Sequence, residues 1–136
     1  MKSFSVHGAL AHSLPLLGTV AAGWPSPAEE ELGDVLSFDE WLLPHREAMC
    51  LIIVTTDAMM NAGIHQGDYV IVERGRRAKP NDIIVAEVDG TTVIRHLTHP
   101  GGISTLTAAH AGYPPITCDL HTRILGVVTA VIRKYR

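Results

Sequence analysis

The pattern of hydrophobic and polar residues changes near residue 48. From there on, short β-branched runs alternate with turn residues, namely MCLIIVTT (49–56), YVIVE (69–73), DIIVAEV (82–88), TTVIRHL (91–97), ISTLTA (103–108) and ILGVVTAVIRKY (124–135). Runs of this length, bounded by Gly, Pro, Asn and Asp, are typical of strands. Six strands at short spacing, with no long helical pattern between them, predict a mainly β fold with a folded, partly closed sheet.

The segments between these runs carry recognisable turn and cap signals. Asp89-Gly90 separates two strand-like runs and predicts a tight hairpin. MMNAG (59–63) predicts a turn or a single helical turn, and AGYPPIT (111–117) predicts a loop. Ser37-Phe-Asp-Glu40 has the spacing of a capping box and predicts a short helix that ends by Pro44.

Residues 1–36 are weakly patterned and rich in Gly and Pro, which predicts an extended or mobile arm before a β domain at 37–136. Lys2 followed by the apolar stretch Leu14–Ala22 imitates a secretory signal. The apolar stretch is short, and two histidines and a proline interrupt the segment, so we favour an arm over an export signal.

Composition narrows the classes of function. The 136 residues fit one domain with a core plus an arm, and the net charge of −3 offers no broad basic field for nucleic acid. The cluster Arg74, Arg76, Arg77 and Lys79 is interpreted as a solvated turn. The two cysteines form no CxxC motif, and no apolar run approaches the roughly 18 residues of a membrane span, so we expect a cytoplasmic protein.

Several stretches carry a family resemblance through their order and spacing. They are AAGWPSPA (21–28), TTDAMMNAGIHQGDYVIVE (55–73), NDIIVAEVDGTTVIRHL (81–97), AGYPPIT (111–117) and GVV (126–128). From about Leu16 onward the chain resembles the LexA/UmuD family of self-cleaving serine peptidases. Within that family it resembles the UmuD type, an SOS-induced accessory subunit of a translesion DNA polymerase. The resemblance implies a LexA/UmuD C-terminal-like β domain with an extended N-terminal arm. The length also fits the UmuD type, because it leaves no room for the helix-turn-helix domain of LexA-type repressors.

The resemblance implies a serine–lysine dyad, and this chain departs from it. A serine hydroxyl needs a neighbouring base, and a buried lysine can serve because desolvation lowers its pKa. The nucleophile position is Ala58, flanked by Thr56, Asp57 and Met59, and the lysine position is Arg95. Alanine has no nucleophile, and arginine stays protonated. Although the family is a peptidase family, we therefore predict that this chain does not cut itself.

Two origins remain open for the substituted dyad. Ala58 alone would suit an engineered, trapped peptidase. Natural loss of activity is favoured, because Arg95 and Thr56 depart from the family pattern as well and one change would have sufficed.

A rebuilt active site is a further alternative. Thr55 or Thr56 could supply a hydroxyl, and His96 or His99 a base, although nothing in the sequence places them within hydrogen-bond reach. The pair His96-x-x-His99 could also suggest a metal, but a metal site needs three or four converging ligands. No metal and no cofactor is predicted.

The stretch VAAGWPSPA (20–28) matches the family's cleavage segment, with Ala22-Gly23 as the bond. Small residues let a backbone enter a narrow cleft, although a plain Pro-rich linker is the alternative interpretation. In active relatives, contact with the RecA filament on single-stranded DNA promotes the cut. The resemblance further implies a homodimer that binds a Y-family translesion polymerase or the replicative clamp, with no direct sequence-specific DNA binding and no membrane.

Three function classes follow. The first is a UmuD-like accessory protein of the SOS response, acting in DNA repair and translesion synthesis without autocleavage. The second is a catalytically dead binding module or inhibitor, unrelated to polymerases, on the same fold. A signal-peptidase-like enzyme ranks last, because the chain lacks a membrane anchor and both dyad residues.

Overall fold

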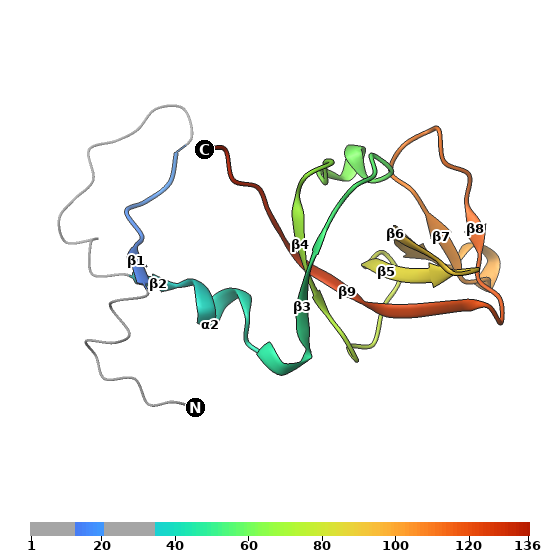
Figure 1. Cartoon of the computed structure of the whole chain (residues 1–136), viewed down its shortest axis with the longest axis horizontal. Coiled ribbons are helices and arrows are strands. Elements are labelled where there is room, and N and C mark those ends of the chain that lie inside the picture. Colours follow the sequence, from blue (N-terminus) through green and yellow to red (C-terminus); the bar gives the residue numbers. More distant parts are fainter. Residues whose placement is uncertain (1–12, 21–34) are drawn as a thin grey trace. The chain divides into compact units, whose positions relative to one another are not determined.

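The computed structural model describes residues 13–20 and 35–136 (Figure 1). The chain divides into two compact units, Met1–Pro44 and His45–Arg136, which we treat separately. The bond Ala22-Gly23 lies outside the described residues.

The first unit contains a small sheet and one short helix. Strand β1 (Ser13–Pro15) pairs antiparallel with β2 (Val35–Ser37), so part of the predicted arm is strand. Helix α2 (Phe38–Leu42) follows at once, and the Ser37 hydroxyl accepts a hydrogen bond of 3.4 Å from the Glu40 N–H. This contact confirms the predicted N-cap, and the helix ends before Pro44 as expected.

The second unit is built on one antiparallel sheet (Figure 1). Its strands are β3 (Met49–Ile53), β4 (Tyr69–Glu73), β5 (Ile83–Val88), β6 (Thr91–Thr98), β7 (Thr105–Thr107), β8 (Ile116–Thr117) and β9 (Thr122–Ile132). They lie in the order β3-β4-β9-β5-β6-β7-β8, so the last strand lies inside the sheet, between β4 and β5. Short 3₁₀ turns lie at Arg46–Ala48, Met60–Ala62 and Pro100–Gly102. The mainly β prediction is confirmed, and the sheet is not closed into a barrel.

All six predicted strands are present; β4 has the predicted bounds, and the other five differ at one or both ends. Strand β3 ends at Ile53. The next residue, Val54, donates its N–H to the carbonyl of Asp68, in the turn before β4, at 2.8 Å. Strand β8 lies in the segment predicted as a loop. The hairpin between β5 and β6 is confirmed: Asp89 and Gly90 have φ of 51° and 83°, as a two-residue turn requires.

Alternation along β5 divides the core into two clusters. Val85 belongs to the first cluster, and its neighbours Ile84 and Ala86 belong to the second. The first also holds Val54, Met59, Ile64, Val70, Val72 and Ile94, and the second Leu97, Leu106 and Val127. The predicted helical turn at 59–63 is confirmed, and it buries Met59 completely. This packing fixes the segment that carries Ala58.

A buried ion pair joins the end of the chain to the turn before β4. Asp68 accepts the His65 N–H at 2.8 Å and is 1% exposed. Its two carboxylate oxygens each accept a hydrogen bond of 2.7 Å from the Arg133 guanidinium. These bonds lower the pKa of Asp68 to about 2. Within the described ranges, no helix is long and apolar enough to cross a membrane.

Candidate functional site

Ala58 lies between β3 and the 3₁₀ turn at Met60–Ala62, in a backbone held from both sides. Its N–H donates to the Thr56 hydroxyl at 3.1 Å, and its carbonyl accepts the Ala109 N–H at 2.8 Å. The residue is fully buried, with 0% of its surface exposed. Ala58, the position that the resemblance assigns to the nucleophile, therefore presents a fixed, buried methyl group.

Tyr113 joins Thr56, Asp57 and Arg95 in one cluster. Its phenol donates a hydrogen bond of 2.5 Å to the Asp57 carboxylate, and the Thr56 hydroxyl donates to the phenol oxygen at 3.4 Å. The guanidinium carbon of Arg95 lies 5.2 Å from the centre of the Tyr113 ring. Thr56 and Asp57 therefore contact the tip of one aromatic side chain, and Arg95 contacts its ring.

Asp57 is the acidic group of this cluster. The Tyr113 hydrogen bond is the main cause that lowers the pKa of Asp57, while burial opposes the shift. His110 Nε2 lies 3.7 Å from the second carboxylate oxygen, and the His110 ring meets the Tyr113 ring edge-on at 5.4 Å. The carboxylate thus stays ionised and engaged with its neighbours.

Arg95 lies on β6 and is 7% exposed. Its Nη1 donates to the Ile94 carbonyl at 2.8 Å, whereas its Nε is buried without a hydrogen-bond partner. Burial lowers the pKa of the Arg95 guanidinium, but an arginine side chain remains protonated in proteins. This position supplies a cation and no base.

Within the described residues, Thr55 and Thr56 are not paired with a histidine that could act as their base. The Thr56 hydroxyl is already engaged by the Ala58 N–H and by Tyr113. Among the described residues, neither His96 nor His99 hydrogen-bonds to a threonine at 55 or 56, and His99 Nε2 instead lies 3.1 Å from the Ser104 hydroxyl. These parts of the chain also contain no group of three or more His, Cys, Asp or Glu placed to hold a metal.

A groove of about 280 Å³ runs up to this cluster. Its lining is largely β-branched and comes from β3 and the segment after it, β4, β5 and β6: Ile52, Ile53, Val54, Thr55, Thr56, Val70, Val85, Thr92, Val93 and Ile94. Thr56 belongs to both the groove and the cluster, because its hydroxyl contacts Tyr113. The groove therefore adjoins the cluster at Thr56.

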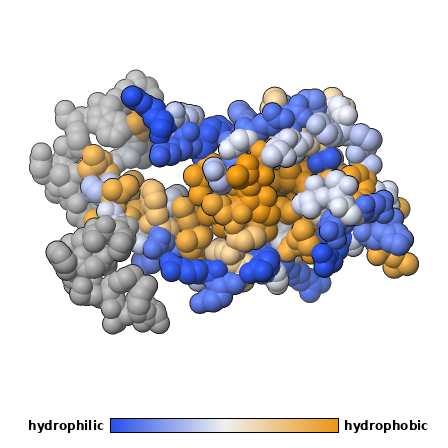
Figure 2. Space-filling view, in the orientation of Figure 1, coloured by the Kyte–Doolittle hydropathy of each residue, from blue (hydrophilic) through white to orange (hydrophobic). Residues whose placement is uncertain are grey.

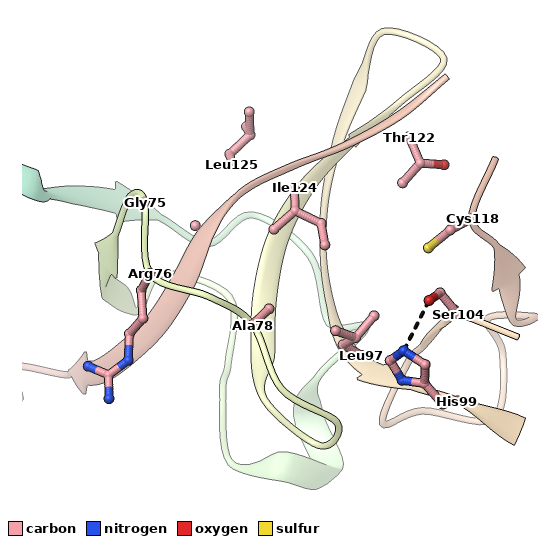
Figure 3. Close-up of a pocket in the computed structure, with 11 residues that line it drawn as sticks. Gly75, Arg76, Ala78, Leu97, His99, Ser104, Cys118, Thr122, Ile124 and Leu125 are labelled. Carbon is pink, nitrogen blue, oxygen red and sulfur yellow. Dashed lines mark hydrogen bonds between the residues drawn. The ribbon is translucent and has the colours of Figure 1, made fainter. Parts of the chain in front are cut away.

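A second cavity, of about 470 Å³, shares no lining residue with the groove (Figure 3). Leu97 and Ile124 contribute apolar surface, and Ser104 and His99 hydrogen-bond to each other at one side. No carboxylate in the described part of the chain hydrogen-bonds to this histidine. The pair thus lacks the third group that orients the base in nucleophilic catalysis.

Sequence reasoning identified Ala58, Arg95, Thr56 and Asp57 but did not single out Tyr113 or His110. Tyr113 stood inside the quoted motif AGYPPIT, where its aromatic ring was the available signal. Its hydrogen bond to Asp57 spans 56 positions along the chain, and a single sequence does not reveal such a contact.

Comparison with known proteins supports the resemblance over most of the chain. The Peptidase S24-like family matches residues 15–129. A LexA repressor of Carboxydothermus hydrogenoformans is 35% identical over 125 residues, which cover 90% of this chain and 61% of that protein. A LexA repressor of Streptomyces clavuligerus is 38% identical over 124 residues, or 91% of this chain and 51% of that protein. The chain thus spans about half to three fifths of the length of these curated relatives.

Proposed function

Because this chain belongs to the Peptidase S24-like family, we propose that it is a UmuD-like accessory protein that acts by binding and does not cut itself. The sequence resemblance assigns Ala58 and Arg95 to the serine and lysine positions, and one observation supports the proposal: Arg95 and Asp57, the neighbour of Ala58, both contact Tyr113. The family match supports the scaffold, and on this proposal the chain lacks the serine and lysine that the scaffold would position. The setting is the response to DNA damage, in translesion synthesis.

Acyl transfer needs a nucleophile and a base within hydrogen-bond reach of each other. The Ala58 methyl group can form no acyl intermediate, and the Arg95 guanidinium cannot accept a proton. The neighbouring carboxylate of Asp57 accepts the Tyr113 hydroxyl and lies 3.7 Å from His110, so it is engaged elsewhere. We infer that the bond Ala22-Gly23 stays intact.

Autocleavage assays test this inference directly. Purified full-length chain is incubated for days at alkaline pH, and separately with RecA, ATP and single-stranded DNA. Mass spectrometry is expected to show intact chain alone. A fragment that begins at Gly23 would refute the proposal.

Restoring the dyad tests whether the scaffold is otherwise competent. The double variant Ala58→Ser with Arg95→Lys is expected to cut at Ala22-Gly23. The single variants are the matched controls and are expected to stay intact, because one lacks the base and the other the nucleophile. An inert double variant that still folds would show that more than the dyad has been lost.

A homodimer is the second part of the proposal. One cross-strand row on β3, β4 and β9 carries Ile53, Tyr69 and Ile132, which are 54%, 41% and 38% exposed. Figure 2 shows an apolar patch over the region where these strands cross in Figure 1. Exposed apolar surface of this kind marks interaction sites. We expect light scattering to report a dimer at micromolar concentration, and a monomer there would contradict this part.

The competing function is a binding module or inhibitor unrelated to polymerases. Pull-down with a Y-family translesion polymerase, with and without the RecA filament, separates the two. Retention of the polymerase supports the UmuD-like role, and its absence, with the chain intact and dimeric, supports the alternative.

A further inference from the structure

The second cavity lies where five segments that are distant in the sequence come together (Figure 3). Its lining comes from 75–78 between β4 and β5, 97–99 at the end of β6, Ser104 before β7, Cys118 after β8 and 122–126 on β9. Its volume of about 470 Å³ falls in the range of about 300 to 1,000 Å³ that is usual for small-molecule sites. The cavity therefore has the size of a site for a small organic ligand.

The apolar part of the lining continues the second core cluster. Leu97 belongs to that cluster, and Ala78 packs against it. Ile124 also lines the cavity, and it remains 43% exposed although its backbone pairs with Ala86 on β5. The sheet thus leaves apolar surface exposed at this cavity, and covering that surface with the apolar body of a ligand is favourable.

The polar part of the lining is a row of three side chains. Ser104 Oγ lies 3.1 Å from His99 Nε2. The Cys118 N–H donates to the Ser104 carbonyl at 3.0 Å, which continues the ladder between β7 and β8 and sets the two side chains next to each other (Figure 3). A hydroxyl, an imidazole and a thiol together offer hydrogen-bond donors and acceptors to one polar group of a ligand.

The charges of the lining favour a neutral ligand. Among the described residues that line the cavity, none is Asp, Glu or Lys. The arginine of this set, Arg76, donates a hydrogen bond of 3.0 Å to the Glu73 carboxylate, and Figure 3 shows its guanidinium turned away from Cys118. Burial raises the pKa of the Cys118 thiol, and Asp119 acts in the same direction, so the thiol is uncharged at neutral pH. A charged ligand would lose hydration here without gaining an ion partner.

We propose that this cavity binds an uncharged small molecule that has an apolar body and one hydroxyl or carbonyl group. The body covers Ile124 and Leu97, and the oxygen forms hydrogen bonds at the pair of Ser104 and His99. The site goes beyond the proposed function and does not depend on it, because the cavity shares no lining residue with the groove beside Thr56.

The two cysteines supply the assay, because Cys118 lines the cavity and Cys50, which is exposed on β3, does not. The full-length chain is alkylated with N-ethylmaleimide in the presence of 4-ethylphenol, and each cysteine is followed by mass spectrometry of its peptide. A probe of this size binds a fitting site with a Kd of about 1 mM. At about 10 mM it is therefore expected to slow the alkylation of Cys118 about tenfold and to leave Cys50 unchanged.

The matched ligand is 4-ethylbenzoate, which has the same apolar body and a charged head. It is expected to protect Cys118 much less than 4-ethylphenol does. Equal protection by the two ligands would overturn the assignment of a neutral ligand. Equal slowing of both cysteines, or no slowing of Cys118, would overturn the site itself.

Variants locate the probe in the cavity. Ser104→Ala is expected to weaken the protection of Cys118 about two- to tenfold, because a hydrogen bond to the probe is lost. Ala78→Leu is expected to abolish it, because the larger side chain occupies the space of the probe. Thr92→Ala, in the groove, is the matched control and should change nothing. Full protection in both cavity variants, or its loss in the control, would contradict the proposal.

A second copy of the chain is the competing occupant of the cavity. Alkylation of Cys118 without any probe is therefore measured at several protein concentrations, with Cys50 as the reference. A rate that stays constant supports a site open to small molecules. A rate that falls at Cys118 alone as the protein concentration rises would overturn the proposal in favour of an interface between copies.

Discussion

Replacing Asp68 by asparagine is expected to destabilise the β domain by breaking a buried ion pair. The Asp68 side chain is 2% exposed and that of Arg133 is 35% exposed. The Arg133 hydrogen bonds are the main cause that lowers the pKa of Asp68 from 3.8 to about 2. At about 1.4 kcal/mol per pKa unit, this shift corresponds to about 2 kcal/mol. Because water reaches Arg133, we expect a loss of about 1 to 2 kcal/mol in the free energy of unfolding at pH 7.

The sign of the pH dependence follows from the depressed pKa. Asp68 is more acidic in the folded chain than in the unfolded chain, so its stabilising effect is complete above about pH 5. It is lost as the pH falls through 4 toward 2, because the folded carboxylate then takes up its proton. The difference in stability between the wild type and Asp68→Asn should therefore shrink over that interval.

Urea unfolding, followed by circular dichroism at several pH values between 7 and 3, measures this difference. Glu87→Gln is the matched control, because its partner Arg123 is 70% exposed and surface pairs contribute at most about 1 kcal/mol. The reasoning would be refuted by an Asp68→Asn penalty that is the same at pH 7 and pH 3. It would equally be refuted by a penalty no larger than that of the control.

Three further changes test separate parts of the structure. Gly126→Ala should lower the free energy of unfolding by about 1 to 3 kcal/mol. The reason is that the new Cβ would lie 2.6 Å from a Val72 methyl and 2.8 Å from the Glu73 carbonyl oxygen. An unchanged midpoint of urea unfolding would contradict this close packing. Tyr113→Phe should raise the pKa of Asp57, read by ¹³C NMR titration of its carboxyl, because the hydrogen bond that lowers it is removed. Ile53→Lys should convert the dimer to a monomer in light scattering, whereas Leu120→Lys, at a fully exposed site (100%), should not.

The sequence was informative where the structure is local. The β-branched runs identified six strands, because a pleated, half-buried surface favours those side chains. Asp89-Gly90 predicted its hairpin because two successive residues there need positive φ. Ser37 predicted its helix because the capping hydroxyl and the N–H that it receives are three residues apart.

The remaining features depend on contacts between distant parts of the chain. The position of β9 between β4 and β5 joins the end of the sequence to its middle, and no local pattern encodes that order. Strand β8 has two residues and is defined by its pairing with β7. Asp68 could be assigned to a turn, but its partner Arg133 lies 65 positions away. In the same way, the motif gave Ala58 and Arg95, and folding supplied the Tyr113 that joins their surroundings.

Ala58 and Arg95, which the proposed function assigns to the serine and lysine positions, have different physical consequences. Alanine at 58 removes chemistry at little cost, because a buried methyl group packs well. Arginine at 95 is costly, because it buries a cation whose Nε has no partner. An apolar side chain of similar volume at a buried charged site is often neutral or stabilising, by about 1 to 4 kcal/mol. A site that had simply lost its purpose would gain from such a replacement. Arg95 is therefore the residue of the proposed pair whose retention needs an explanation beyond packing.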